Sequence, residues 1–163
     1  MVRAIVYVSA AGHTERYARL LAEQTGVPAC SLKEAAGSVP KGAPVLLLGW
    51  VRAGRIQGLR RAQRHFAVAA ACGVGMNPAD EQTGQVLRRA NPSAPDVLFY
   101  LRGGMDPQKL HGLHKLLIGA MAGELQKKAD PTPAQREMAA LLQNGADFVD
   151  PAALLPVREW MAR

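Results

Sequence analysis

The sequence is poor in cysteine and in aromatic residues, and it contains no long apolar run. Of the 163 residues, 5% are aromatic and two are cysteines, Cys30 and Cys72. The cysteine spacing matches no metal or redox motif, so we expect two reduced thiols in a cytoplasmic protein. No stretch approaches the ~18–20 apolar residues that a membrane-spanning helix needs. Length and composition together favour one soluble globular domain over residues 1–163.

Acidic residues are absent from residues 35–79, and the whole chain carries a net charge of +7. The same stretch contains the basic residues Lys41, Arg52, Arg55, Arg60, Arg61 and Arg64. A face of one sign attracts anionic partners. Candidate partners are therefore an acidic redox protein, a small carboxylated substrate, an anionic membrane surface or nucleic acid. The alternative is a basic face that contacts only solvent.

Several motifs that would indicate other functions are also missing. The chain has neither the Gly-Lys-Ser/Thr ending of a Walker loop nor the Gly-x-Gly-x-x-Gly dinucleotide fingerprint. No Ser/His/Asp or Cys/His arrangement indicates a hydrolase. His111 and His114 have no third ligand near them in the sequence, so we expect no metal site.

What the sequence does contain is an alternation of apolar strands and helices. Strands are predicted at residues 2–8, 28–32, 44–49, 66–72 and 97–101. Helices are predicted from the first turn to residue 26, and at 57–64, 80–90, 107–128, 134–143 and after Asp150-Pro151. Loops are predicted at 33–43 and 50–56. This alternation is typical of an α/β fold, in which helices cover both faces of a parallel sheet.

The turn after the first strand is the best candidate for an anion site. It reads Ser9, Ala10, Ala11, Gly12, His13, Thr14 and leads directly into a helix. Helix N-termini present unpaired amides that favour negative charge, and small side chains let a phosphate approach them. No Lys or Arg lies in the turn; His13 would pair with a phosphate when protonated, or face solvent. Such residues are common in strand–helix connections, so the turn by itself is a weak signal.

The stretch from Ile5 to Glu23 resembles the opening of flavodoxins, whose phosphate loop reads Ser/Thr-x-Thr-Gly-x-Thr. Ser9, Gly12 and Thr14 match this pattern, whereas Ala11 replaces a hydroxyl residue. One hydrogen bond to a charged group is thereby lost, which costs about 1.5–3 kcal/mol. The resemblance implies a flavodoxin-like five-stranded parallel sheet in the order 2-1-3-4-5 with helices on both faces. It also implies flavin mononucleotide (FMN) bound at the C-terminal ends of the first, third and fourth strands.

Two further segments resemble the flavodoxin loops that surround the flavin ring. The loop after the third strand would supply Trp50, Val51, Arg52, Ala53 and Gly54. In it, Trp50 would stack on the ring or pack on the sheet edge, and Gly54 would permit a backbone flip or only a turn. The loop after the fourth strand would supply Gly73, Val74, Gly75 and Met76, although its glycines would also serve simply to end the strand.

Residues 99–105, followed by a long helix, resemble the branch that includes flavodoxin-type protoporphyrinogen oxidase, where extra sequence precedes the final helix. This implies an extra helical segment at about 105–150, which would cover the flavin, form a homodimer face or lie against a membrane. The implied function is an FMN-binding electron carrier or oxidoreductase with a redox partner protein or a small anionic substrate. The alternative is a binding module that has lost FMN and uses its basic residues 41–64 to bind an acidic protein or nucleic acid.

Overall fold

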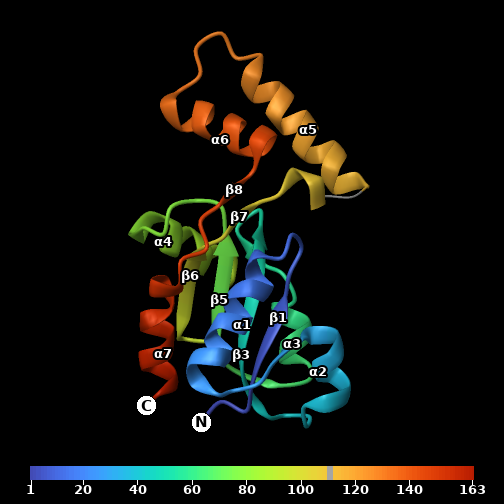
Figure 1. The fold of residues 1–163 in the computed structure, drawn as a ribbon, viewed down its shortest axis with the longest axis vertical. Coiled ribbons are helices and arrows are strands. Elements are labelled where there is room, and N and C mark those ends of the chain that lie inside the picture. The colour runs from blue at the N-terminus through green and yellow to red at the C-terminus, as the bar shows by residue number, and fades with distance from the viewer. Residues whose placement is uncertain (110–111) are drawn as a thin grey trace. The chain divides into compact units, whose positions relative to one another are not determined.

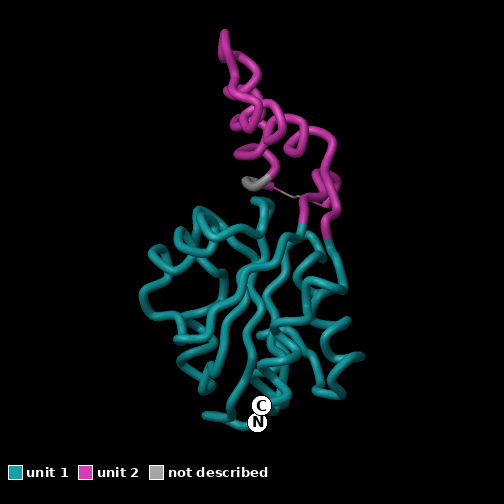
Figure 2. Tube along the Cα trace, turned by 90° about the vertical axis from the view of Figure 1, so that its left-hand side faces the viewer, with its two compact units in different colours: residues 1–103, 149–163 teal, residues 104–148 magenta. Residues whose placement is uncertain are grey.

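A parallel sheet forms the centre of the larger of two compact units in the computed structural model, which describes residues 1–109 and 112–163. This unit comprises residues 1–103 and 149–163, and the smaller unit comprises residues 104–148 (Figure 2). The parallel strands are β1 (Ala4–Val8), β2 (Ala29–Ser31), β3 (Pro44–Arg52), β5 (Ala67–Gly75) and β6 (Leu98–Arg102). Their order is β2-β1-β3-β5-β6 (Figure 1), which confirms the predicted arrangement of the five strands.

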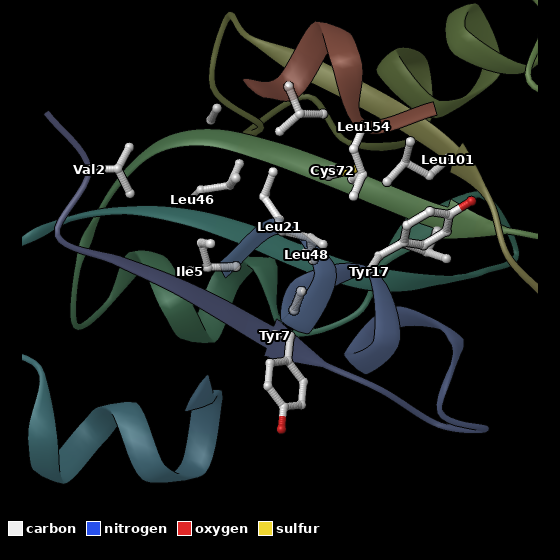
Figure 3. Close-up of a cluster of buried hydrophobic side chains, with 14 residues drawn as sticks. Val2, Ile5, Tyr7, Tyr17, Leu21, Leu46, Leu48, Cys72, Leu101 and Leu154 are labelled. Carbon is white, nitrogen blue, oxygen red and sulfur yellow. The ribbon is translucent and has the colours of Figure 1, made fainter. Parts of the chain in front are cut away.

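Helices cover both faces of this sheet. One face carries α1 (His13–Thr25) and α7 (Leu155–Met161), and the other carries α2 (Leu32–Ser38), α3 (Leu59–Gln63) and α4 (Glu81–Ala90). Successive side chains of a strand point to opposite faces. In β3, therefore, Leu46 and Leu48 pack on the α1 side (Figure 3), while Val45 and Leu47 pack on the other. Both faces of the sheet are thus filled by apolar side chains.

The prediction of a loop at residues 33–43 is wrong for residues 33–38, because α2 occupies Leu32–Ser38. The Ser31 side chain accepts from the Glu34 amide, and the Glu34 carboxylate accepts from the Ser31 amide, so a complete capping box starts the helix. Leu32 and Ala35 are buried on its inner side. The glycine and proline that suggested a loop lie near its C-terminus and beyond it.

The predicted loop at residues 50–56 is also wrong. β3 continues to Arg52, turns at residues 53–54 and returns as β4 (Arg55–Ile56), which pairs antiparallel with β3. Similarly, β5 runs through Gly73 to Gly75 rather than breaking at its glycines. A Cβ atom at Gly73 would lie 3.0 Å from the Leu87 and Val51 side chains, so this glycine allows close packing within the strand.

The smaller unit begins and ends with a short antiparallel pair, β7 (Gly104–Met105) and β8 (Ala146–Asp147). Between them lie a 3-10 turn, η1 (Pro107–Lys109), and two helices, α5 (Leu113–Gln126) and α6 (Pro133–Asn144). Of the two histidines considered as a pair, His111 lies outside the described residues. The described residues contain no cluster of three potential metal-binding side chains.

The chain returns to the larger unit through η2 (Pro151–Leu154), whose Asp150 cap and following proline match the prediction. The Asp150 carboxylate accepts from the Ala152 amide at 2.9 Å. Among the helices of the described residues, none is long and apolar enough to cross a membrane.

Candidate functional site

The C-terminal ends of the parallel strands gather the predicted site segments at one edge of the sheet. In the sheet, β2 lies on one side of β1 and β3 lies on the other. The direction in which successive strands are added to the sheet therefore reverses at β1. Open α/β sheets bind ligands at such a reversal, beyond the carboxyl ends of the strands. The turn after β1, the hairpin after β3 and the loop after β5 all belong to this edge.

The turn after β1 has the backbone and donors of an anion site. Gly12 adopts φ 97, a conformation that favours glycine, and Ser9 Oγ accepts from the Gly12 amide at 3.1 Å. Helix α1 starts at His13 without a side-chain cap, as do α3, α5 and α7, whereas Ser31 caps α2, Asp80 caps α4 and Thr132 caps α6. What sets α1 apart is its place, because its first turn presents these amides directly after the carboxyl end of β1.

The other two residues at the start of α1 are held by the fold. Thr14 is only 2% exposed and packs inward from the second position of the helix. His13 is half-buried, and a Cβ atom at Gly103 would lie 3.3 Å from the His13 Cβ. The base of the His13 side chain is therefore close to the end of β6.

The one acidic side chain in the first turn of α1 is Glu15, and it is paired within the helix. Arg19 donates to the Glu15 carboxylate through Nη2 at 2.6 Å and Nε at 2.9 Å. Arg19 lies one turn further along α1, and this i,i+4 ion pair partly offsets the negative charge of Glu15 near the helix N-terminus. Burial, with the nearby Glu15 carboxylate as a second cause, raises the pKa of Tyr7 on the adjacent strand.

The hairpin after β3 is a tight turn clamped by a buried asparagine. Ala53 and Gly54 have φ 49 and 76, and two positive φ values are the mark of a type I′ turn. Asn91, the C-cap of α4, is 6% exposed. Its Nδ2 donates to the Gly54 carbonyl at 2.8 Å, and its Oδ1 accepts from the Ile56 amide at 2.9 Å. Nδ2 also donates to the Leu87 carbonyl at 2.8 Å, so α4 fixes the backbone of the hairpin.

Trp50 and Val51 lie on opposite faces of the sheet. Trp50 is half-buried near the end of β3 and follows Leu46 and Leu48 on the α1 side, by the alternation of strand side chains. Val51 belongs to the apolar cluster of the other face, where it packs near Gly73. The structure therefore places Trp50 on the α1 side of the edge, whereas Val51 is part of the core.

The loop after β5 is held by side chains from β6. The Tyr100 hydroxyl donates to the Asn77 carbonyl at 3.0 Å, and Arg102 Nε donates to the Met76 carbonyl at 3.0 Å. Burial raises the pKa of Tyr100 to about 12. Among the predicted residues of this segment, Gly73 and Val74 lie inside the strand and are buried, whereas Gly75 and Met76 are half-buried at its end.

Four residues outside the predicted set organise this edge. They are Asn91, Tyr100, Arg102 and Tyr17, whose hydroxyl donates to the Arg102 carbonyl at 2.7 Å and accepts from the Asp150 amide at 3.1 Å. Only Asn91 had a local signal, because Pro92 follows it and helices commonly end before a proline. The long-range partners of the other three depend on the fold.

The donor set of the turn fits the phosphate group of FMN. The Ser9 hydroxyl, a glycine in the left-handed region and the start of a helix without a side-chain cap are neutral dipoles suited to an anion, whereas the structure buries the predicted donor Thr14. A family model for the flavodoxin domain matches residues 4–132. No sequence among the curated proteins matches the chain.

Proposed function

The chain belongs to the flavodoxin domain family, and on that premise we propose that it binds FMN and works as a redox protein. The observation that carries the proposal is the turn at the carboxyl end of β1, where Ser9 and Gly12 at φ 97 precede the start of α1. In this proposal the turn amides and the Ser9 hydroxyl hold the phosphate group, whereas the buried Thr14 packs within the fold. The flavin, when bound, supplies the electron-accepting and electron-donating chemistry.

Six of the other predicted residues would surround the ring at the same edge. Trp50, which alternates with Leu46 and Leu48 of the α1 side, would stack on the ring, and stacking on an aromatic side chain is worth about 1–3 kcal/mol. The hairpin residues Arg52, Ala53 and Gly54 would border one side of the ring, and Gly75 with Met76 the other. Because Asn91 and Arg102 hold these two loops in place, the loops around the ring would be largely preformed before the flavin binds.

Within this function, the charge of the chain favours a role different from that of an acidic electron carrier. The chain has a net charge of +7, so its redox partner or substrate is expected to be anionic. This agrees with an oxidoreductase like those of the protoporphyrinogen oxidase branch, in which extra sequence also precedes the final helix. We therefore propose a flavin-dependent oxidoreductase with an anionic substrate or partner.

One observation favours a second candidate function, a binding module that has lost FMN. Ala11 stands where flavodoxins place a hydroxyl residue, so one donor to the phosphate is missing. In that case the basic residues 41–64 would carry the function by binding an acidic protein or nucleic acid. The two candidates differ directly in whether the protein takes up flavin.

Titration of the flavin-free protein with FMN, followed by quenching of flavin fluorescence, tests the proposal. We expect the unmodified protein to bind FMN and Gly12→Val to abolish binding, because a branched side chain would fill the turn. Gly26→Val is the matched control, since Gly26 has φ 72 at the opposite end of α1 and open space around its Cβ position. It introduces comparable backbone strain away from the site and should keep the affinity. Equal FMN affinity in Gly12→Val and the unmodified protein would remove the turn from the site.

A further inference from the structure

We infer that an exposed basic face of the larger unit is the docking surface for an acidic electron-transfer protein. The basic face consists of five arginines on the β3–β4 hairpin and on or next to α3, namely Arg52, Arg55, Arg60, Arg61 and Arg64. The inference rests on the proposed redox function. It identifies the kind of partner protein that would approach the proposed flavin site on the side of the flavin ring.

The positive charge of this face is unopposed over its own stretch of the sequence. All five arginines are exposed, and residues 35–79, every one of which the structure describes, include no acidic residue. Among the described residues, no carboxylate forms an ion pair with any of the five. Other arginines do have internal partners: Arg19 pairs with Glu15, and Arg88 donates to the Pro95 and Asp96 carbonyls at 2.7 Å.

The hairpin presents its two arginines at a cost in stability. Arg52 and Arg55 are directly opposite each other in the antiparallel pair, and like charges in that position destabilise a hairpin. Between them, Ala53 has φ 49, a left-handed conformation that is strained for a residue with a side chain. Asn91 nevertheless fixes the turn from α4. A rigid, strained turn that holds two unpaired like charges is expected where an external partner supplies the opposite charge.

The composition of the face favours a protein over the other anionic partners. Residues 35–79 include none of the exposed large apolar side chains of the described chain, so nothing there would enter a lipid layer. None of their exposed residues is Trp, Tyr or Phe, so this face has no exposed aromatic side chain on which the bases of a single-stranded nucleic acid would stack. Five arginines on two elements are also more than one small carboxylate requires. A polar, charge-steered and transient contact is typical of electron-transfer complexes.

The position of the hairpin connects this surface to the proposed flavin site. Arg52 ends β3 two residues after Trp50, and α3 begins just after the hairpin at Leu59. The C-terminal end of α3 lies near the start of β3, where the Gly42 amide donates to the His65 carbonyl at 2.7 Å. The hairpin arginines Arg52 and Arg55 are therefore the part of the face that lies at the edge where Trp50, Gly54 and Met76 would border the flavin ring. An acidic donor or acceptor would be steered to the end of the site at which electrons enter or leave.

The test measures binding of an acidic plant-type [2Fe–2S] ferredoxin to the full chain by calorimetry, with and without FMN. The informative variant is Arg60→Glu/Arg61→Glu, which leaves every residue proposed to contact flavin unchanged. The charge-matched control is Arg158→Glu/Arg163→Glu, two exposed positions in and after α7, on the opposite face of the sheet. Circular dichroism and unfolding curves confirm that both variants fold.

We expect ferredoxin binding to weaken as ionic strength rises from about 10 mM to about 100 mM, where the screening length falls from about 30 Å to about 10 Å. The double substitution in α3, Arg60→Glu/Arg61→Glu, should lower the affinity for ferredoxin about tenfold or more. The control Arg158→Glu/Arg163→Glu should lower it less than about twofold. The inference would be overturned if both double variants lost the same affinity, or if the affinity did not change with salt concentration. Tighter binding of mixed-sequence duplex DNA that depends on the same α3 pair would also overturn it, in favour of nucleic acid. Failure of the proposed function appears separately, as a chain that takes up no FMN, because ferredoxin binding is measured without flavin as well.

Discussion

The Tyr17 hydroxyl donates a 2.7 Å hydrogen bond to the carbonyl of Arg102, which lies at the end of β6. The same hydroxyl accepts from the Asp150 amide at 3.1 Å. The chain leaves the larger unit after residue 103 and returns to it at residue 149. One side chain of α1 therefore holds both the last strand before the smaller unit and the first residues after it. The larger unit can in this way keep its own core although its sequence is interrupted.

Tyr17→Phe is expected to destabilise the protein by about 1–3 kcal/mol, because the ring stays packed while the two backbone groups lose their partner. Tyr17 is fully buried, so water cannot easily replace the hydroxyl. Chemical denaturation of the variant and the unmodified protein measures the difference. A change below about 0.5 kcal/mol would mean that Arg102 and Asp150 find other partners.

Asn91→Ala should cost about 2–3 kcal/mol, since it leaves the Ile56 amide and the Gly54 and Leu87 carbonyls without the side chain that satisfies them. The effect should also reach the proposed flavin site, because the hairpin loses its attachment to α4. Unfolding curves give the stability, and proteolysis at Arg52 and Arg55 reports hairpin opening. Unchanged cleavage at both arginines would contradict the clamp.

Ala53→Asn should stabilise the protein by about 0.5–1 kcal/mol, because asparagine tolerates the positive φ that alanine adopts here at a cost. Gly54→Ala serves as the opposite control. It places a side chain at φ 76, where its Cβ would lie 3.1 Å from Ala90 Cβ, and should destabilise. Melting temperatures of the two variants should therefore move in opposite directions, and a shift in the same direction would exclude the proposed turn strain.

The sequence was sufficient to predict the five parallel strands and most helices, because buried parallel strands appear as short apolar runs. It was insufficient where one segment depended on another. Gly73 looked like the end of a strand, yet it lies inside β5 because Leu87 and Val51 occupy the space where a side chain would be. Gly37 and Pro40 suggested a loop, although the Ser31–Glu34 capping box starts a helix before them.

The same distinction holds for the candidate site: one part of it can be predicted from local sequence and another part cannot. The turn from Ser9 to Thr14 could be selected from its own residues, since small and hydroxyl side chains before a helix are a local pattern. The clamp on the hairpin could not, because Asn91 lies more than thirty positions away from its partners Gly54 and Ile56. Likewise, Tyr100 appears in the sequence as one more aromatic residue of a buried strand, and only the fold brings its hydroxyl to the Asn77 carbonyl.

The pKa of Tyr100 predicts a loss of stability in alkaline solution. Burial raises this pKa from 10.0 to about 12, so the folded protein holds the phenol proton more tightly than the unfolded chain does. The resulting stabilisation is fully present below about pH 10 and is lost as the pH rises through about 12. Tyr100→Phe removes this dependence. The difference in unfolding free energy between the two proteins should shrink over this range, and a constant difference would contradict the shift.

Ala11→Thr provides a gain-of-function test of the phosphate turn. The residue lies immediately before Gly12 in the turn, and a hydroxyl there would add one donor to a charged phosphate, worth about 1.5–3 kcal/mol. FMN affinity should therefore rise about tenfold or more. Ala10→Thr is the matched control, because Ala10 is exposed and stands at a position where flavodoxins accept any residue. Fluorescence titration of both variants should show tighter binding for Ala11→Thr alone. Equal affinities would mean that the side chain at position 11 does not face the phosphate, and the turn would then hold the anion through its amides and Ser9 only.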